Sequence, residues 1–128
     1  MSLDGGTVQE LLRDPDAAHV ARGHVRSFCA ALSPDLTETA ALLVTEVVTN
    51  ALAHAQGRIV LRLTHQGSHL LVEVTDGSAE LEVKLLPPSL HALGGRGLML
   101  VDRLAGSWGV LTAAPTKTVW FTLPWSAS

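Results

Sequence analysis

Three polar residues recur at intervals of one helical turn inside a mostly apolar stretch, and this pattern constrains the fold more than any other feature. Glu46, Asn50 and His54 stand at positions i, i+4 and i+8, so a helix places all three on one face. A carboxylate, a carboxamide and an imidazole are costly to bury unless a polar partner meets them. A metal-bound phosphate chain is one such partner. The apolar positions around them, which predict a buried helix, are Leu42, Leu43, Val44, Val47, Val48 and Ala51.

The size and composition of the chain predict one packed domain. Its 128 residues suit a single domain over residues 1–128, with a core from about 14 to 123. Apolar residues make up 47% and charged residues 16%, which favours a packed core over disorder. The formal net charge is −3 and the nine Lys and Arg residues form no run, so we expect no direct contact with nucleic acid.

Cysteine use and hydropathy bear on the compartment. Cys29 is the only cysteine, which excludes an intrachain disulfide, and its apolar surroundings predict a core position. No apolar run approaches the roughly 20 residues that span a bilayer. The segment from Met1 to Thr7 lacks the basic and apolar regions of a signal peptide. We therefore expect a cytoplasmic protein without membrane contact.

The first half of the chain predicts one short strand and two helices. Val8 to Leu12 predicts the strand, and Asp14-Pro15-Asp16 predicts a helix start. That helix is expected to continue to about Leu32, where Ser33-Pro34-Asp35 breaks it. The second helix, from about Leu36 to Ala53, carries the polar trio. The expected apolar face of the first helix comprises Val20, Ala21, His24, Val25, Phe28 and Leu32.

The second half predicts two hairpins separated by an irregular segment and a short helix. Alternating apolar residues predict strands from Arg58 to Thr64 and from Leu70 to Thr75, joined by a turn at Gln66-Gly67-Ser68. Ser78 to Leu93 is irregular, and such a long connection is usually functional. A helix from Leu98 to Leu104 and strands Trp108–Thr112 and Thr118–Leu123 follow. The expected fold is α+β, with helices on one face of a mostly antiparallel mixed sheet.

Four segments, in this order and setting, resemble the Bergerat, or GHKL, ATP-binding fold. The resemblance extends from about Asp14 to Leu123 and is closest to the bacterial anti-sigma-factor serine kinases, particularly the short stand-alone ATP-binding regulators of actinomycetes. It implies ATP and Mg²⁺ as ligands. The segments that carry it are Leu43-Val44-Thr45-Glu46-Val47-Val48-Thr49-Asn50-Ala51, Val74-Thr75-Asp76-Gly77-Ser78, Gly94-Gly95-Arg96-Gly97-Leu98-Met99-Leu100-Val101-Asp102 and Lys117-Thr118-Val119-Trp120-Phe121.

The resemblance implies specific roles for the residues of the polar helix. Asn50 would hold Mg²⁺ through its carboxamide oxygen, since Mg²⁺ prefers hard oxygen ligands shared with phosphates. Glu46 would act as general base toward the attacking hydroxyl. Alternatively, Asn50 bonds a neighbouring backbone group and Glu46 is a solvated helix residue. His54 either contacts a phosphate or caps the helix end, where its positive form is favoured by the dipole.

The resemblance also implies how the base is bound. Asp76 would accept a hydrogen bond from the adenine amino group, and Gly77 would let the ring approach the backbone. The alternative is an Asp-Gly turn without a ligand. The sequence departs here from the fuller Asp-x-Gly-x-Gly pattern, because Asp76-Gly77-Ser78-Ala79-Glu80 lacks the later glycine. Thr118 would bond the adenine edge or is an ordinary strand threonine, and Lys117 is equally consistent with a solvated edge charge.

The glycine-rich segment would complete the site at the phosphates. Gly95 and Gly97 would let backbone N–H groups approach the phosphates at a helix start, and Arg96 would reach the terminal phosphate. Alone, such a cluster is only a flexible turn, and it matches neither a Walker loop nor a dinucleotide-binding fingerprint. The tryptophans, which we expect to serve packing and not ligand stacking, are Trp108, Trp120 and Trp125.

Three functions remain open from the sequence. The first is an ATP- and Mg²⁺-dependent serine/threonine protein kinase that phosphorylates an anti-anti-sigma-type partner and sequesters a sigma factor. The second is a nucleotide-sensing module that controls a protein partner without phosphotransfer. The third is a vestigial pocket on a protein that acts through its surface. Retention of both Glu46 and Asn50 favours the first function, and the resemblance also implies a homodimer.

Overall fold

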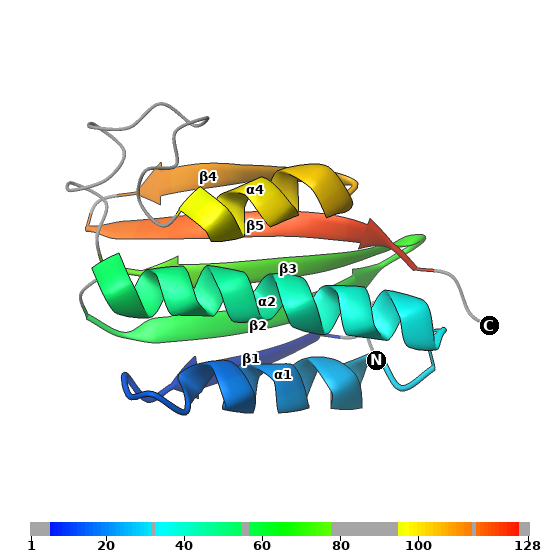
Figure 1. Cartoon of the computed structure of the whole chain (residues 1–128), viewed down its shortest axis with the longest axis horizontal. Coiled ribbons are helices and arrows are strands. Elements are labelled where there is room, and N and C mark those ends of the chain that lie inside the picture. Colours follow the sequence, from blue (N-terminus) through cyan, green and yellow to red (C-terminus); the bar gives the residue numbers. More distant parts are fainter. Residues whose placement is uncertain (1–5, 32, 55–56, 78–94, 114, 126–128) are drawn as a thin grey trace.

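The helices of the described chain lie side by side on one face of a five-stranded sheet (Figure 1). The computed structural model describes residues 6–31, 33–54, 57–77, 95–113 and 115–125, and for residues 54 and 95–98 only the backbone. The helices are α1 (Ala17–Phe28), α2 (Pro34–His54) and α4 (Gly95–Leu104), with α2 between the other two. The predicted two-layer α+β architecture is confirmed.

The sheet has the strand order β1-β2-β3-β5-β4. Each of its four pairings is antiparallel, so the sheet is more regular than the mixed sheet predicted from the sequence. The two predicted hairpins and the predicted N-terminal strand are present. The strands are β1 (Gly6–Leu11), β2 (Ile59–Gln66), β3 (His69–Asp76), β4 (Ser107–Ala113) and β5 (Thr116–Pro124).

Strict alternation along β2, β3 and β5 gives the sheet one apolar face. Gly67, with φ of 56°, provides the left-handed conformation that the two-residue β2–β3 turn requires. The residues covered by the helices are fully buried, as predicted for β2 and β3. They are Ile59, Leu61, Leu63, Leu70, Val72, Val74, Phe121 and Leu123. The alternate residues point to the other face, which we call the open face because no described helix covers it. They include Arg62, Glu73, Thr75, Thr118 and Trp120.

Helix α1 contacts the core through small residues spaced four apart. It buries Ala17, Ala21 and Val25, and Cys29 directly after it is also buried, as predicted. Burial raises the pKa of the Cys29 thiol to about 11. The predicted position of Val20 in the core is wrong, because this side chain is 41% exposed. The helix ends at Phe28, short of the predicted Leu32.

Helix α2 begins at Pro34, whose fixed φ suits the first helical position. The Ser33 hydroxyl caps this end by accepting a hydrogen bond from the Leu36 N–H at 3.3 Å. At 21 residues, α2 is long and apolar enough by length and composition to cross a membrane, unlike what we expected from the sequence. Its apolar residues, however, pack into the core against the sheet, which accounts for this composition.

The tryptophans have packing roles, as predicted. Trp108 donates its indole N–H to Asp102 at 2.9 Å, which links β4 to α4. Trp125 stacks on His65 with ring centroids 3.8 Å apart. Trp120 lies on the open face against Gly109 of β4, its direct cross-strand partner. An added Cβ at Gly109 would lie 2.9 Å from Trp120 Cζ2, so only glycine fits beneath the ring.

Replacing Gly109 with alanine is therefore expected to destabilise the fold by about 1–3 kcal/mol, because the indole must shift or the edge strand must move. Urea unfolding followed by tryptophan fluorescence measures the change. Gly23→Ala is the matched control, since nothing lies within 4 Å of a Cβ at this position in α1. It should leave stability unchanged or raise it by up to about 1 kcal/mol. A Gly109→Ala variant as stable as Gly23→Ala would contradict this packing.

Candidate functional site

The segments singled out in the sequence converge at one end of the molecule, on the left in Figure 1. There the C-terminal end of α2, the end of β3, the start of β5 and the start of α4 come together. Pairing of Asp76 with Lys117 joins the two strand ends directly. Helix α2 packs against α4, β3 and β5. Residues far apart in the sequence thus contribute to one region.

Glu46 and Asn50 lie on the edge of α2 that borders α4. Successive helix residues differ by about 100° around the axis. The sheet side of α2 is marked by its buried residues, and the α1 side by Thr45, whose hydroxyl accepts a hydrogen bond from Arg22 at 3.1 Å. Because α2 lies between α1 and α4, the polar edge that remains faces α4 (Figure 1).

The polar groups on this edge are available to a ligand. Both the Glu46 and Asn50 side chains are half-buried. In the described part of the chain, no hydrogen bond or ion pair engages either of them. The alternative in which Asn50 bonds a neighbouring backbone group therefore finds no support among these residues. His54 is the last residue of α2, so the predicted one-turn spacing of the trio is confirmed, while the His54 side chain lies outside the description.

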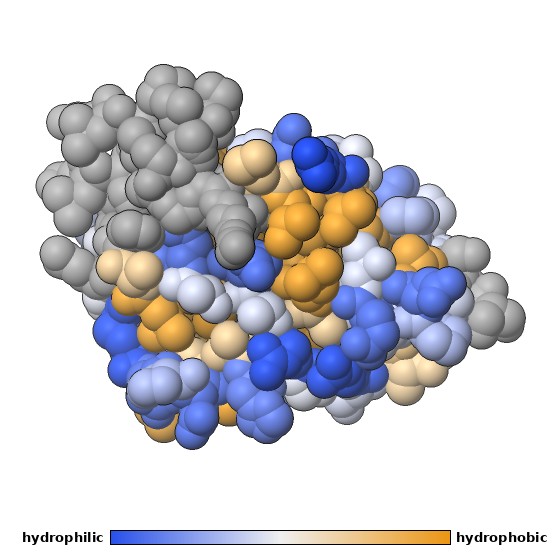
Figure 2. All heavy atoms as spheres, viewed as in Figure 1, coloured by the Kyte–Doolittle hydropathy of each residue, from blue (hydrophilic) through white to orange (hydrophobic). Residues whose placement is uncertain are grey.

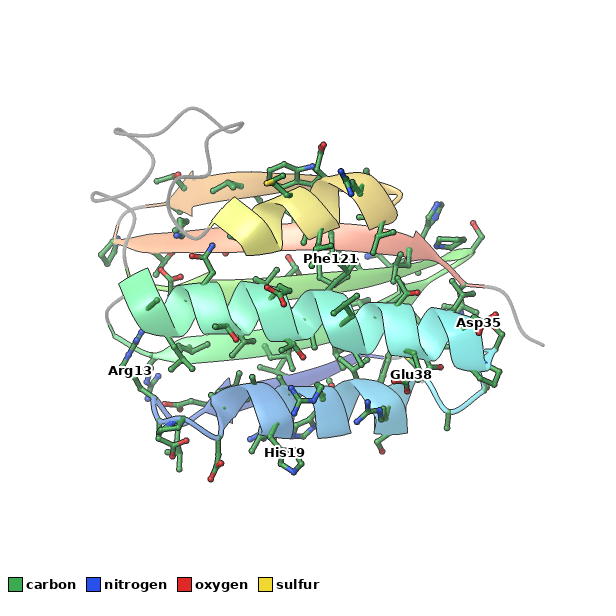
Figure 3. All side chains as sticks on the ribbon, viewed as in Figure 1. Arg13, His19, Asp35, Glu38 and Phe121 are labelled. Atoms are coloured by element: carbon green, nitrogen blue, oxygen red, sulfur yellow. The ribbon has the colours of Figure 1, made fainter. Side chains whose placement is uncertain are left out.

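Arg13 holds the end of α2 that carries this site (Figure 3). Its guanidinium donates to the carbonyl oxygens of Ala51 and Leu52, both at 3.4 Å, and to that of Gly57 at 3.1 Å. A cation is favoured at a helix C-terminus, where unpaired carbonyls accumulate. Arg13 thereby fixes α2 relative to the start of β2. Sequence reasoning missed this residue, because its partners lie about 40 positions away along the chain.

Gly57 has φ of 75° and lies against Gly77, with an added Cβ 3.7 Å from the Gly77 Cα. The backbone leading into β2 therefore passes close to the backbone that follows Asp76. Gly77 itself is half-buried. The backbone at the end of β3 is therefore packed on one side against the backbone at Gly57.

Asp76 and Lys117 form a buried ion pair at the strand ends. Asp76 is 2% exposed and continues the buried positions of β3, so its carboxylate lies on the helix-covered face. Lys117 Nζ lies 3.9 Å from Asp76 Oδ2. The interpretation of Lys117 as a solvated edge charge is wrong, because β5 lies between β3 and β4 and the lysine occupies a buried position.

Thr118 lies on the opposite face from Asp76. Its hydroxyl is 2.7 Å from that of Thr75 on the open face, as the alternation along β5 requires. The structure therefore does not bring the Thr118 side chain together with the Asp76 carboxylate. The β5 side chain that lies beside the Asp76 carboxylate is that of Lys117. The burial of Lys117 was predictable from the sequence, because it lies two and four residues before the core residues Val119 and Phe121 and so on the same face of the strand.

The glycine-rich segment forms the first turn of α4, which begins at Gly95 and not at the expected Leu98. Gly95, Arg96 and Gly97 thus supply backbone N–H groups that have no partner within the helix. The Arg96 side chain, Gly94 and the segment 78–93 lie outside the described residues. Figure 2 shows apolar side chains gathered over α4 and its boundary with α2. Among the described side chains of these helices, the exposed large apolar residues are Leu42, Met99 and Leu104.

The sequence matches the family described as histidine kinase-like ATPase domain over residues 11–123. No curated protein matches the chain. Among solved structures, the RsbU and RsbW domains of Rv1364c from Mycobacterium tuberculosis align with a TM-score of 0.73 and 17% identity, covering 96% of this chain and 32% of that one. The blue-light activated histidine kinase EL346 from Erythrobacter litoralis aligns with a TM-score of 0.64 and 23% identity, covering 84% and 40%.

The histidine kinase domain of the same Erythrobacter litoralis protein aligns with a TM-score of 0.60 and 22% identity, covering 85% of this chain and 59% of that one. At such identities, the likeness of these structures shows a common fold. The chain spans between 32% and 59% of the length of the three structures.

Proposed function

This chain belongs to the family of histidine kinase-like ATPase domains, and from that premise we propose that it binds ATP with Mg²⁺ and transfers the terminal phosphate to a serine or threonine. The acceptor is an anti-anti-sigma-type protein, and the protein also sequesters a sigma factor, acting in the cytoplasm as a homodimer. The observation that carries the proposal is the half-buried polar edge of α2, whose Glu46 and Asn50 have no described partner.

The donor set at this edge fits a magnesium–nucleotide complex. Asn50 offers a hard carboxamide oxygen at the boundary of α2 and α4, and Mg²⁺ is usually held by few protein ligands together with phosphate oxygens. Backbone N–H groups of Gly95 and Gly97 in the first turn of α4 suit phosphate oxygens, and the resemblance implies that Arg96 reaches the terminal phosphate. Bound there, the ion would neutralise charge on the phosphate chain.

Glu46 acts as the general base in this proposal. Its carboxylate, one turn before Asn50, takes the proton from the acceptor hydroxyl. The hydroxyl oxygen then forms a bond to the terminal phosphorus, and the bond from that phosphorus to the bridging oxygen breaks, leaving ADP. The exposed apolar residues beside this edge, Leu42, Met99 and Leu104, favour a protein as the acceptor.

A second candidate is a nucleotide-sensing module that controls a protein partner without phosphotransfer. The shortened segment Asp76-Gly77-Ser78 favours it, because the later glycine of the fuller pattern is missing. Both candidates require the same nucleotide site. They differ only in the use made of Glu46.

Calorimetric titration tests the common premise. We expect ATP to bind in the presence of Mg²⁺ and more weakly in EDTA, because EDTA removes the ion that would link Asn50 to the phosphates. GTP should bind about tenfold more weakly than ATP, because its base presents a carbonyl where adenine presents an amino donor to Asp76. ADP reports the contribution of the terminal phosphate. A folded protein that binds none of the three nucleotides would end the assignment of the site.

A further inference from the structure

The two edge strands of the sheet, β1 and β4, differ in what would stop another strand from pairing with them (Figure 1). An edge strand is a template for pairing unless charges or proline block it. β1 carries Glu10, whose carboxylate lies 3.4 Å from the Arg58 guanidinium. β4 contains neither a charged residue nor proline, and its central residues Val110 and Leu111 are 42% and 60% exposed. Of the two edges, β4 is therefore better suited to accept a further strand.

The alternation of hydrogen bonds across the sheet shows which backbone groups of β4 point outward. Trp125 donates its N–H to the carbonyl of Ser68, its register partner, at 2.7 Å. Successive residues of an inner antiparallel strand bond to its two neighbours in turn, so the even-numbered residues of β5 bond to β4. Thr122 agrees with this, because its carbonyl accepts the Gly106 N–H at 2.7 Å. The residues of β4 whose N–H and C=O groups point to the free edge are therefore Trp108, Val110 and Thr112.

These three residues are spaced symmetrically, so β4 is able to pair with a second copy of itself. About a twofold axis at Val110, Val110 faces its own counterpart, and Trp108 faces Thr112 of the second copy. Each outward residue of both strands then belongs to a hydrogen-bonded pair. Within the described part of the chain, no hydrogen bond engages these outward backbone groups. Because β4 is uncharged, two copies of it also meet without repulsion between like charges.

The open face of β4 adds a packing feature that complements itself under the same axis. Gly109 has no side chain, and the half-buried Trp120 indole lies against it. Leu111, two residues further on, projects from the same face. In the twofold register, Leu111 lies directly opposite Gly109 of the second copy, where Cα atoms are about 4.5 Å apart. Its exposed side chain thereby comes to lie beside the Trp120 indole of the second copy.

We propose that two copies of this chain dimerise through β4, paired antiparallel about a twofold axis at Val110, so that the two five-stranded sheets become continuous. A second copy is the favoured occupant because the hydrogen bonds and the leucine–glycine contact both repeat under this axis. The contact is small, so we expect a dissociation constant on the order of micromolar. The inference rests on the homodimer of the proposed function and locates its interface, without using the nucleotide site.

Sedimentation velocity over a range of concentrations compares the wild-type chain with three variants. Proline at position 110 removes an outward N–H and no bond to β5, so Val110→Pro should fold yet dimerise about 100-fold more weakly. The same alternation directs the N–H of Val8, on β1, away from β2, so Val8→Pro is the matched control and should dimerise normally. Leu111→Glu should weaken dimerisation about tenfold, because it places a carboxylate against the indole face.

A crosslink tests the register. Val110→Cys places two thiols across the twofold axis, where the Cα atoms of a hydrogen-bonded pair are about 5.5 Å apart, within disulfide range. Treatment with diamide should link most of this variant into dimers. Val8→Cys, which replaces a valine that is 58% exposed on the other edge, should stay largely unlinked. The wild-type chain controls for the buried Cys29 and should not be linked.

The outcomes separate this contact from the rest of the proposed function. A wild-type dimer that survives both Val110→Pro and Leu111→Glu, or that is lost only in Val8→Pro, overturns the β4 contact but leaves the homodimer standing. A wild-type protein that is monomeric at all concentrations overturns the contact and the homodimer, while calorimetry with ATP on the same sample decides the nucleotide site independently. If Val110→Pro fails to fold, Leu111→Glu and Val110→Cys decide the question, since neither removes a backbone group.

Discussion

Replacing Asn50 with alanine is expected to lower the affinity for ATP in the presence of Mg²⁺ by roughly 100-fold. The carboxamide oxygen is the side-chain ligand that we assign to the metal, and alanine has nothing to replace it. Calorimetric titration in Mg²⁺ and in EDTA measures the effect. The variant in Mg²⁺ should bind ATP no more tightly than the wild-type protein binds it in EDTA.

Stability and binding should move in different directions in this variant. Asparagine is a poorer helix former than alanine, so Asn50→Ala in the long helix α2 should leave the melting temperature unchanged or raise it. A loss of binding then has no explanation in unfolding. Thr49→Ala is the neighbouring control, because Thr49 is exposed and not on the α4 edge. Unchanged magnesium dependence in Asn50→Ala would show that the metal is held elsewhere.

The sheet was predictable because its pattern admits one solution. In β2 and β3 the apolar residues alternate strictly, and a shift by one residue would expose all of them at once. Helix α1 was less well determined. Ala21 and Val20 are both apolar, but α1, which packs against α2, buries Ala17, Ala21 and Val25 and leaves Val20 exposed. Close approach of two helices favours small side chains, so hydrophobicity correctly placed Ala21 and Val25 on the packed face but wrongly included Val20.

The candidate site was predictable where it follows one element, and much less so where it joins several. The face shared by Glu46 and Asn50 follows from helical geometry alone. The pairing of Asp76 with Lys117 depends on the register between β3 and β5, which are separated by 39 residues of chain between Asp76 and Thr116. The resemblance directed attention to Thr118, whereas strand parity places Lys117 beside Asp76. Contacts such as those of Arg13 have no local signal at all.

Replacing Glu46 with glutamine should reduce phosphotransfer by about 10²–10⁴-fold while leaving ATP affinity within a few-fold of wild type. Glutamine keeps the size and hydrogen-bonding reach of glutamate but does not accept a proton at neutral pH. The measurement is transfer of a radiolabelled terminal phosphate from ATP to an anti-anti-sigma-type acceptor, in parallel with calorimetric ATP binding. An effect on transfer without an effect on binding identifies a group used in the chemical step and not in nucleotide recognition.

The control for this variant lies on the same helix. Glu38 is exposed and pairs with Arg26, whose guanidinium lowers the pKa of the Glu38 carboxyl through a hydrogen bond of 3.0 Å. Glu38→Gln removes a carboxylate from α2 at a surface site, where ion pairs contribute little, so transfer should be unaffected. Wild-type transfer by Glu46→Gln would exclude this carboxylate as the base. Tight ATP binding by the wild-type protein without any transfer would instead favour the sensing module, because the site would then hold its nucleotide without using Glu46 for catalysis.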